Sequence, residues 1–252
     1  MFKKIGVQLW TVREFMNDKE SIKRTFAKLK ELGYDEVQTA GCKVPFEEFG
    51  ELAKEAGLEI VGTHESFKKM RTDTEASMAD HRALNTTNMG VGGFNFSTAA
   101  EVEEFIKNAN TVADKIYEHG FKFTYHNHSH EFAKLENGKT GMEMLIEGLD
   151  PEKTSFVLDT YWVQHGGGNP VEWIEKLAGR IDILHLKDMA VTVERKQFYA
   201  EIGRGNINFE AVIDAAEKAG VKYLCVEQDE CPGDPFESLK ISSDYLRNLL
   251  GL

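Results

Sequence analysis

The sequence predicts an α/β fold, a single (β/α)8 barrel that forms one domain over residues 1–252. Two observations support this fold class. Eight short runs rich in β-branched and aromatic residues alternate with helix-like segments, which is typical of a parallel sheet covered by helices. Several helix-like segments end on a glycine directly before the next strand-like run, as in KELG-YDEVQ and EKAG-VKYLCVE. Eight such units suit closure of the sheet into a barrel.

The expected strands are residues 4–9, 35–39, 58–63, 86–91, 121–127, 155–159, 181–186 and 222–227. The fourth run has the weakest signal, because TTNMGVGGF is rich in glycine and polar residues. An open doubly wound sheet is the alternative. It is disfavoured because QLWTVRE follows the first strand, where a dinucleotide-binding sheet would have a glycine-rich turn.

The expected helices lie near residues 19–32, 46–56, 74–83, 99–119, 140–148, 170–178, 208–219 and 236–250. Capping residues stand where some of them should begin: Ser97-Thr98 before AAEVEEF, Asn169 before Pro170, and Asn208 before FEAVIDAAEKAG. Glycine tolerates the left-handed conformation that commonly ends a helix. Four glycines fit that role: Gly33, Gly57, Gly120 and Gly220.

Charge and composition exclude several classes of function. Thirty Lys and Arg against 42 Asp and Glu give a net charge of −12, which disfavours binding to a phosphate backbone, so we expect no nucleic-acid partner. Three cysteines cannot form a disulfide framework, and no segment resembles a signal peptide or a membrane span. We therefore expect a cytoplasmic protein without a membrane partner, and a homo-oligomer remains possible.

The residues that end the expected strands are the strongest functional signal. In such barrels the active site lies at the carboxyl ends of the strands, so these side chains should converge. Gln8 and Trp10 follow the first strand, Gln38 the second and His64-Glu65 the third. The later strands end in His126, Asn127, His128, Asp159, His185, Lys187 and Glu227, and the histidines and carboxylates among them are types that bind metals.

Two imidazoles and two carboxylates suit one divalent cation, either Mn²⁺, Co²⁺, Zn²⁺ or Mg²⁺. We expect His126, Asp159, His185 and Glu227 to be its ligands. Each residue alone has a structural alternative, because a histidine can be a core residue and a carboxylate can cap a loop or pair with a lysine. Aromatic residues would line the mouth or pack at its rim: Trp10, Phe67, Phe94, Tyr125 and Trp162.

These residues lie in segments that resemble a known family. GVQLWTVRE, YHNHSHEF, LDTYWV, RIDILHLKD, IGRGNINF and VEQD are similar to the sugar isomerase/epimerase family with a xylose-isomerase-like TIM barrel. That grouping includes inosose dehydratases, ketose 3-epimerases and, more distantly, endonuclease IV. The likeness runs over essentially the whole chain and is not specific for one substrate.

The resemblance implies a metal site on strands five to eight. Asp159, His185 and Glu227 match three of the family's ligands directly. The ketose epimerases have a glutamate on strand five, whereas this chain has His126 there and Glu131 five residues later, so either residue could be the fourth ligand. Trp162 stands where those epimerases have a substrate-binding histidine.

The leading hypothesis is a metal-dependent isomerase or epimerase that forms an enediolate next to a polarised carbonyl. Glu227 would be the base, His64 or His128 its partner, and Lys187 would stabilise the oxyanion. A dehydratase of an inosose or keto-sugar is the main alternative, because it uses the same intermediate. A sugar-binding barrel without catalysis and an endonuclease IV-like enzyme are weaker alternatives, the latter because the chain has only eight histidines.

The substrate is expected to be a sugar or cyclitol without a phosphate. The loops that often bind phosphate in barrels contain GRGN (203–206) and DECPGDP (229–235), and the second is acidic. Arg204 is then expected to contact a substrate hydroxyl or a neighbouring carboxylate, and Trp10 and Trp162 to contact the substrate.

Overall fold

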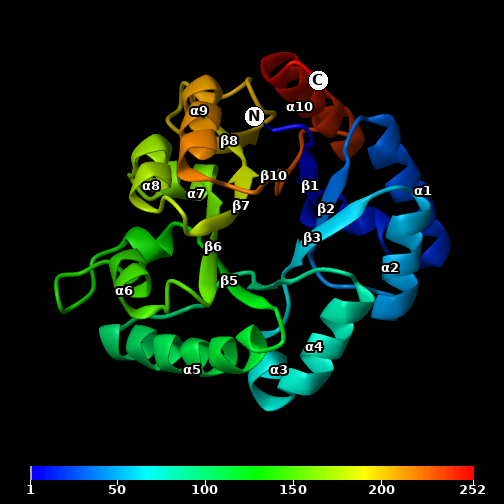
Figure 1. The fold of residues 1–252 in the computed structure, drawn as a ribbon. Helices are drawn as coiled ribbons and strands as arrows, with labels where there is room; N and C mark the ends of the chain where they lie inside the picture. The colour runs from blue at the N-terminus through cyan, green and yellow to red at the C-terminus, as the bar shows by residue number, and fades with distance from the viewer. Residues whose placement is uncertain (1) are drawn as a thin grey trace.

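The computed structural model describes residues 2–252 and has the expected architecture, a single (β/α)8 barrel (Figure 1). Eight parallel strands form the central sheet, and the helices surround it. All eight expected strands are confirmed. They are β1 (Gly6–Gln8), β2 (Glu36–Thr39), β3 (Glu59–Thr63), β4 (Asn88–Val91), β5 (Lys122–His126), β6 (Thr154–Asp159), β7 (Ile181–Leu186) and β10 (Tyr223–Val226).

The eight expected helices are also present. They are α1 (Lys19–Glu31), α2 (Phe46–Glu55), α4 (Thr74–Ala83), α5 (Ala99–Tyr117), α6 (Gly141–Gly148), α8 (Pro170–Lys176), α9 (Phe209–Ala219) and α10 (Pro235–Leu250). The predicted caps explain where several begin. Thr98 and Glu101 form a reciprocal capping box at α5, and the Asn208 side chain accepts from the Ala211 N–H at α9. Gly220 ends α9 at a φ of 75°, a conformation that glycine adopts without strain.

The barrel is nearly closed, and its seam lies between β3 and β4. The strands pair in the order β3-β2-β1-β10-β7-β6-β5-β4. Across the seam, the Asn88 side chain donates to Val61 O at 2.8 Å, and Gly90 N donates to Thr63 Oγ1 at 3.2 Å. A Cβ at Gly90 would lie 2.1 Å from Thr63 O. The glycine that weakened the sequence signal of this strand is therefore required for the close approach.

The interior of the barrel is filled by apolar side chains. Val61, Val157, Ile183 and Cys225 form a small buried cluster inside the sheet. A larger hydrophobic core lies between the sheet and the helices. The buried Cys225 thiol thus acts as a small apolar side chain, as predicted. The site has to lie beyond this inner cluster, toward the ends of the strands.

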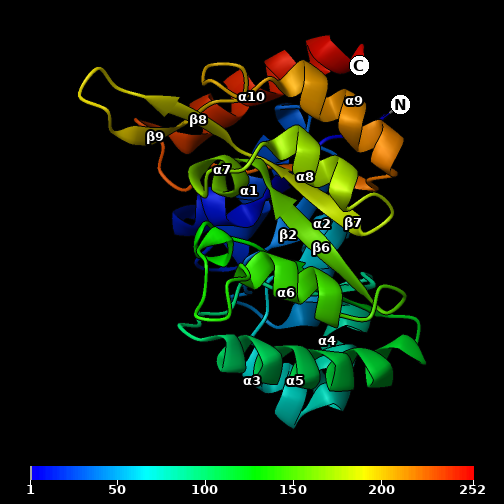
Figure 2. The ribbon, with the colours of Figure 1, turned by 90° about the vertical axis from the view of Figure 1, so that its left-hand side faces the viewer.

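Several short elements follow strands and were not predicted. They are the turns η1 (Leu9–Phe15) and η2 (His130–Phe132), the helices α3 (Phe67–Thr72) and α7 (Thr160–His165), and a hairpin of β8 (Asp188–Val191) and β9 (Gln197–Ala200). The hairpin projects from the barrel (Figure 2). The first strand is shorter than expected, because the chain turns into η1 at Leu9. Within residues 2–252, no helix has the length and apolarity needed to cross a bilayer.

Candidate metal centre

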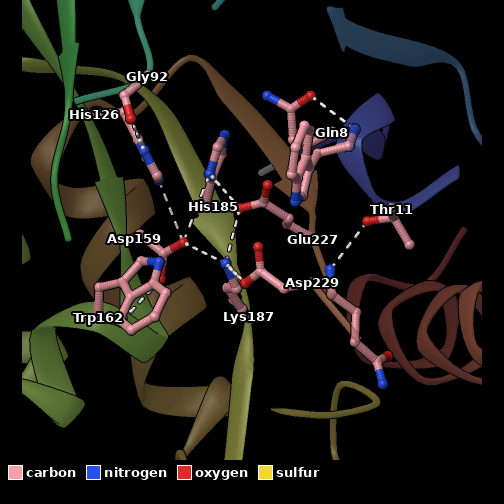
Figure 3. Close-up of polar contacts among 12 residues, drawn as sticks. Gln8, Thr11, Gly92, His126, Asp159, Trp162, His185, Lys187, Glu227 and Asp229 are labelled. Atoms are coloured by element: carbon pink, nitrogen blue, oxygen red, sulfur yellow. Dashed lines mark hydrogen bonds and ion pairs between the residues drawn. The ribbon is translucent and has the colours of Figure 1, made fainter. Parts of the chain in front are cut away.

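Four side chains of the types that bind divalent cations meet at the ends of neighbouring strands (Figure 3). They are His126, Asp159, His185 and Glu227, the set expected from the sequence. Their potential ligand atoms all lie within 4.8 Å of one another, and all four residues are buried. They extend from β5, β6, β7 and the end of β10. The arrangement is a compact cluster of two imidazoles and two carboxylates.

The alternation of strand side chains explains this convergence. Asp159, His185 and Glu227 each lie two residues beyond a member of the inner apolar cluster, so they point to the same interior face. Asp159 and His185 are also direct partners in the register between β6 and β7. The apolar cluster therefore forms a floor, and the polar residues form the layer above it.

Hydrogen bonds orient both imidazoles toward the cluster. His126 Nδ1 lies 3.3 Å from Gly92 O, so a proton on Nδ1 leaves Nε2 free, and Nε2 lies 3.4 Å from Asp159 Oδ2. His185 Nε2 donates to Gln38 Oε1 at 2.5 Å, and its Nδ1 lies 3.1 Å from Glu227 Oε2. Histidine ligands commonly donate their second N–H to a carbonyl in this way.

A buried lysine forms ion pairs with the carboxylates. Lys187 Nζ lies 3.1 Å from Glu227 Oε2 and 3.6 Å from Asp159 Oδ2, and it also contacts Asp229 Oδ2. Burial alone would raise the carboxyl pKa values of Asp159 and Glu227, but Lys187 and the histidines hold both below their usual range. Both carboxylates are therefore ionised at neutral pH.

The cluster has an excess of negative charge. Asp159, Glu227 and Asp229 supply three negative charges, and Lys187 supplies one positive charge. Burial opposes protonation of His185, but Glu227 and Asp159 raise its pKa to about 9. Three aromatic rings enclose the Lys187 ammonium, with centroids 5.1 to 5.9 Å from Nζ. The cluster thus favours additional positive charge, as a cation site does.

A cavity of about 430 Å³ opens above the cluster. Its walls include the predicted residues Trp10, His64, His128, Lys187 and Glu227. Burial and the nearby His126 lower the pKa of His64 well below its ordinary value and that of His128 to about 3, so both are neutral at pH 7. A larger groove of about 920 Å³ lies elsewhere, along α2 and the end of α4, and has charged residues of both signs.

Glu131 lies behind this cavity and outside the four-residue cluster. Its buried carboxylate accepts from Tyr125 Oη at 2.8 Å and from His128 N at 2.9 Å. His130 Nδ1 lies 3.2 Å from the same carboxylate, and His130 Nε2 donates to Phe94 O at 2.9 Å. His128, His130 and Glu131 form a second group of potential ligands, but these contacts already use its carboxylate and one imidazole. His126 is thus the strand-five member of the cluster.

Three aromatic residues expected at the mouth lie elsewhere. Tyr125 is fully buried against Glu131, and Phe94 stacks on Phe105 with centroids 4.6 Å apart. Phe67 also packs against Phe105, at 4.7 Å. None of the three lines the cavity, and of the two alternatives packing holds, because their side chains lie against Phe105 of α5. Trp162 packs 5.4 Å from His128, beside the cavity.

Arg204 is exposed and is not among the residues that line the cavity. The loop that contains it wraps around the buried carboxylate of Asp188. The N–H groups of Gly203 and Gly205 donate to Asp188 Oδ2 at 3.0 and 2.9 Å. These amides are thus committed to a protein carboxylate and are not free to bind a phosphate.

Sequence reasoning missed some residues of the site. Asp229 lines the cavity, as do Gly92 and Gly93, whereas Glu65, which also lines it, was among the expected strand-end residues. A Cβ on Gly93, whose φ is +124°, would lie 2.9 Å from His128 Nδ1. The position of Asp229, two residues after Glu227, was a usable signal, because alternate residues can share a face. Nothing in the sequence distinguishes Gly92 and Gly93 from the glycines of an ordinary loop.

Comparison with known proteins finds relatives by sequence and by fold. An inosose dehydratase of Geobacillus thermodenitrificans is 25% identical over 232 residues, covering 82% of this chain and 73% of that protein. One of Mesomycoplasma hyopneumoniae is 26% identical over 181 residues, covering 62% of this chain and only 57% of that protein. A sugar phosphate isomerase/epimerase structure from Parabacteroides distasonis has a TM-score of 0.82 and 26% identity, with 97% of this chain and 98% of that chain covered.

The model of one family covers most of the chain. The family is described as the xylose isomerase-like TIM barrel, and its model matches residues 26–249. This range includes β2 to β10 and all four residues of the cluster. The chain therefore belongs to the xylose isomerase-like TIM barrel family.

Proposed function

We propose that this protein is a divalent-metal-dependent isomerase or epimerase that acts on a sugar or keto-sugar by proton transfer next to a carbonyl. One observation supports this most strongly. Two imidazoles and two carboxylates converge beneath a cavity, and one of the carboxylates, Glu227, also lines that cavity. A base beside a cation site is the arrangement that proton abstraction next to a carbonyl requires.

The residues fit a divalent cation. His185 Nδ1 is buried and faces the carboxylates of Glu227 and Asp159, at 3.1 and 3.7 Å, as expected for a nitrogen held toward a shared metal. His126, Asp159, His185 and Glu227 would hold the ion, and this donor set accommodates Mn²⁺, Co²⁺, Zn²⁺ or Mg²⁺. When bound, a divalent cation would supply Lewis-acid polarisation of a substrate oxygen.

The side chains of the cavity then have distinct roles. A carboxylate oxygen of Glu227 takes the proton from the carbon beside the carbonyl. The C–H electron pair forms a C=C bond, and the carbonyl π pair moves to oxygen to give an enediolate. Lys187, 3.1 Å from Glu227, lies close enough to stabilise that negative charge. His64 and His128 follow the ends of β3 and β5, away from β10, and contact the substrate from the other walls. Return of the proton to a different carbon or face completes the reaction.

The cavity favours an uncharged substrate. Lys187 is the one lysine or arginine that lines it within residues 2–252, and Lys187 is already paired with Glu227 and Asp229. Glu65 adds a further carboxylate to the walls. A phosphate would meet repulsion here, whereas hydroxyl groups can donate to these oxygens. We therefore infer a sugar or cyclitol without a phosphate.

The experiment is an assay of free and phosphorylated keto-sugars and inososes in D₂O, with Mn²⁺, Co²⁺, Zn²⁺ or Mg²⁺ added in turn. An isomerase or epimerase incorporates solvent deuterium at carbon and changes the position of the carbonyl or the stereochemistry, without loss of water. Activity should require the cation and an unphosphorylated substrate. His185→Ala is the inactive control. Absence of both exchange and turnover with every substrate, despite bound metal, would contradict catalysis and favour a sugar-binding barrel.

A dehydratase of an inosose or keto-sugar is the second candidate. His126 occupies the position where the ketose epimerases are expected to have a second metal-bound glutamate, so the pair of carboxylates that could serve both faces of a carbon is missing. Both relatives compared by sequence are inosose dehydratases. In the same assay, a dehydratase would release water and form an enone or diketone, which ultraviolet absorbance detects.

A further inference from the structure

A network of buried amides lies behind the cavity. Gln8 at the end of β1 and Gln38 in β2 are both fully buried. Trp10 N donates to Gln8 Oε1 at 3.2 Å. A backbone N–H can only donate, so this contact fixes which end of the Gln8 side chain is the oxygen. The Gln8 Nε2 group therefore faces the opposite way, toward the site.

The two hydrogens of Gln8 Nε2 have two acceptors within reach. Gln38 Oε1 lies 3.1 Å away, and His64 Nδ1 lies 3.3 Å away. An amide NH₂ group donates hydrogen bonds and cannot accept them. His64 Nδ1 therefore accepts with its lone pair, and the single proton of the neutral ring is on Nε2.

The same network orients a member of the metal cluster. Gln38 Oε1 accepts from His185 Nε2 at 2.5 Å, in addition to the hydrogen bond from Gln8. A proton on His185 Nε2 leaves Nδ1 as the nitrogen that faces the carboxylates. The backbone N–H of Trp10 thus determines, through Gln8 and Gln38, that His64 Nδ1 accepts and that His185 Nε2 donates.

The proton on His64 Nε2 has no acceptor among the side chains and backbone of the described residues. His64 lines the cavity, and its Nε2 atom is buried without a hydrogen-bond partner among residues 2–252. A buried N–H without an acceptor is costly, so sites that keep one commonly satisfy it with a ligand or water. A substrate oxygen in the cavity is an acceptor of the right kind.

We propose that Gln8 is a positioning residue that holds His64 as the Nε2–H tautomer and so makes His64 a hydrogen-bond donor to a substrate oxygen. The contact with substrate rests on the proposed function, whereas the tautomer does not. The consequence for the reaction is specific. His64 stabilises charge on oxygen and does not remove the proton from carbon, which leaves Glu227 as the base.

The test is ¹⁵N NMR of the imidazole nitrogens in the full-length protein, with the His64 signals assigned by their loss in His64→Asn. We expect a protonated Nε2 and an unprotonated Nδ1 in the wild type. In Gln8→Glu the new carboxylate can only accept, so the proton should move to Nδ1. Gln8→Met removes both hydrogen bonds without adding charge and should give a mixture of tautomers.

A matched control comes from another buried glutamine at a strand end. Gln228 follows Glu227, and its Nε2 donates to Glu230 O at 3.2 Å, so within residues 2–252 it makes no hydrogen bond with His64. Gln228→Met should leave the His64 signals unchanged. A proton on Nδ1 in the wild type, or the same His64 signals in Gln8→Glu and Gln8→Met as in the wild type, would overturn the proposal.

A kinetic measurement separates this inference from the proposed function. With a substrate found in the D₂O assay, Gln8→Glu, which moves the proton to Nδ1, should lower kcat by about 10²- to 10³-fold, as loss of one oxyanion donor does, with a much smaller change in KM. Gln8→Met keeps part of the Nε2–H tautomer, so its kcat should fall less. A rise in KM at unchanged kcat would contradict the donor role. If the wild type shows the Nε2–H tautomer but neither binds a cation nor turns over, the proposed function fails while the assignment to Gln8 stands.

Discussion

Glu227 is both a member of the candidate metal centre and the proposed base. It lies at the end of an apolar strand, contacts Lys187 and His185, and lines the cavity. Glu227→Gln keeps the shape of the side chain but removes the base. We expect kcat to fall by at least about 10²- to 10⁴-fold, because that is the usual effect of losing a general base.

The exchange of the substrate proton with D₂O should disappear in parallel with turnover in Glu227→Gln. Metal affinity, measured by calorimetry, should fall less than in Asp159→Ala, because an amide oxygen still coordinates weakly. Exchange at the wild-type rate in this variant would show that Glu227 is a ligand only. The base would then have to be another residue of the cavity, such as His128.

Asp229 is predicted to strengthen cation binding, because it shares the Lys187 ammonium with Glu227 and Asp159 and so leaves these two carboxylates more negative charge. It contacts the Lys187 ammonium, which also lies near Glu227 and Asp159. In Asp229→Asn the ammonium is shared only with those two carboxylates, so it competes more strongly with the metal. We expect metal affinity to drop about 10- to 100-fold, as it does when residues that support ligands are changed.

A double variant checks that explanation. Asp229→Asn combined with Lys187→Met leaves two carboxylates and no lysine, so calorimetry should show metal affinity close to that of the wild type. If affinity stays low in the double variant, competition by the ammonium is not the reason for the loss.

The residues of the cluster could be predicted from the sequence, whereas the network behind them could not. Asp159, His185 and Glu227 end apolar runs, and in a barrel the carboxyl ends of all strands surround the active site. By contrast, the hydrogen bond between His185 and Gln38 joins residues 147 positions apart. Nothing in the local sequence around Gln38 indicates that its carbonyl would meet an imidazole of β7.

At the scale of elements, length decided what could be predicted. Several strands directly follow a glycine that ends a helix, and capping residues begin several helices. The expected helices are long enough to show these signals. The helices α3 and α7 have only six residues each, fewer than two turns, so no periodicity is visible. The β8–β9 hairpin lacks the Asn-Gly or Asp-Gly turn that would have identified it.

The loop of residues 203–207 should depend on one carboxylate. Asp188 accepts from four backbone N–H groups, those of Met189, Gly203, Gly205 and Ile207, at 2.8 to 3.2 Å. Asp188→Asn replaces one accepting oxygen with an NH₂ group that faces donors. We expect the free energy of unfolding to fall by about 1–3 kcal/mol, the cost of leaving buried groups unpaired.

Urea unfolding measures that loss, and hydrogen exchange of the Gly203 and Gly205 amides should become faster. Asp214→Asn is the control, because Asp214 makes an exposed ion pair with Lys218, and such pairs contribute little. Equal stability of the two variants would show that the loop does not depend on Asp188.

At the scale of the whole molecule, the two ends of the barrel have different chemistry. The carboxyl ends of the strands hold the cluster and the cavity, and Glu36 lies at the opposite end, at the start of β2. Burial raises the pKa of Glu36 to about 7, although Lys4 opposes the shift. Other titratable groups that face it are Asp35, Glu59, Tyr223 and Cys225.

This shift predicts how stability depends on pH. The folded protein holds a proton on Glu36 that the unfolded chain releases near its ordinary pKa of 4.5. The contribution of Glu36 is therefore most favourable below that value and is lost as the pH rises through about 7. Glu36→Gln should gain stability relative to the wild type at pH 8 and little at pH 5, measured by urea unfolding. Glu59→Gln, at the exposed partner of Lys4, is the control, and an identical gain at both pH values would contradict the assignment.

The central claim is that the four converging residues bind a divalent cation, and its direct test is metal stoichiometry. After incubation with Mn²⁺, Co²⁺, Zn²⁺ or Mg²⁺ and dialysis, elemental analysis of the wild type should find one cation per chain. Asp159→Ala and His185→Ala should lose it while the circular dichroism spectrum of the barrel is unchanged, and His119→Ala, at an exposed histidine outside the cluster, should keep it. A wild type without a stoichiometric cation, or full occupancy in both cluster variants, would contradict the claim.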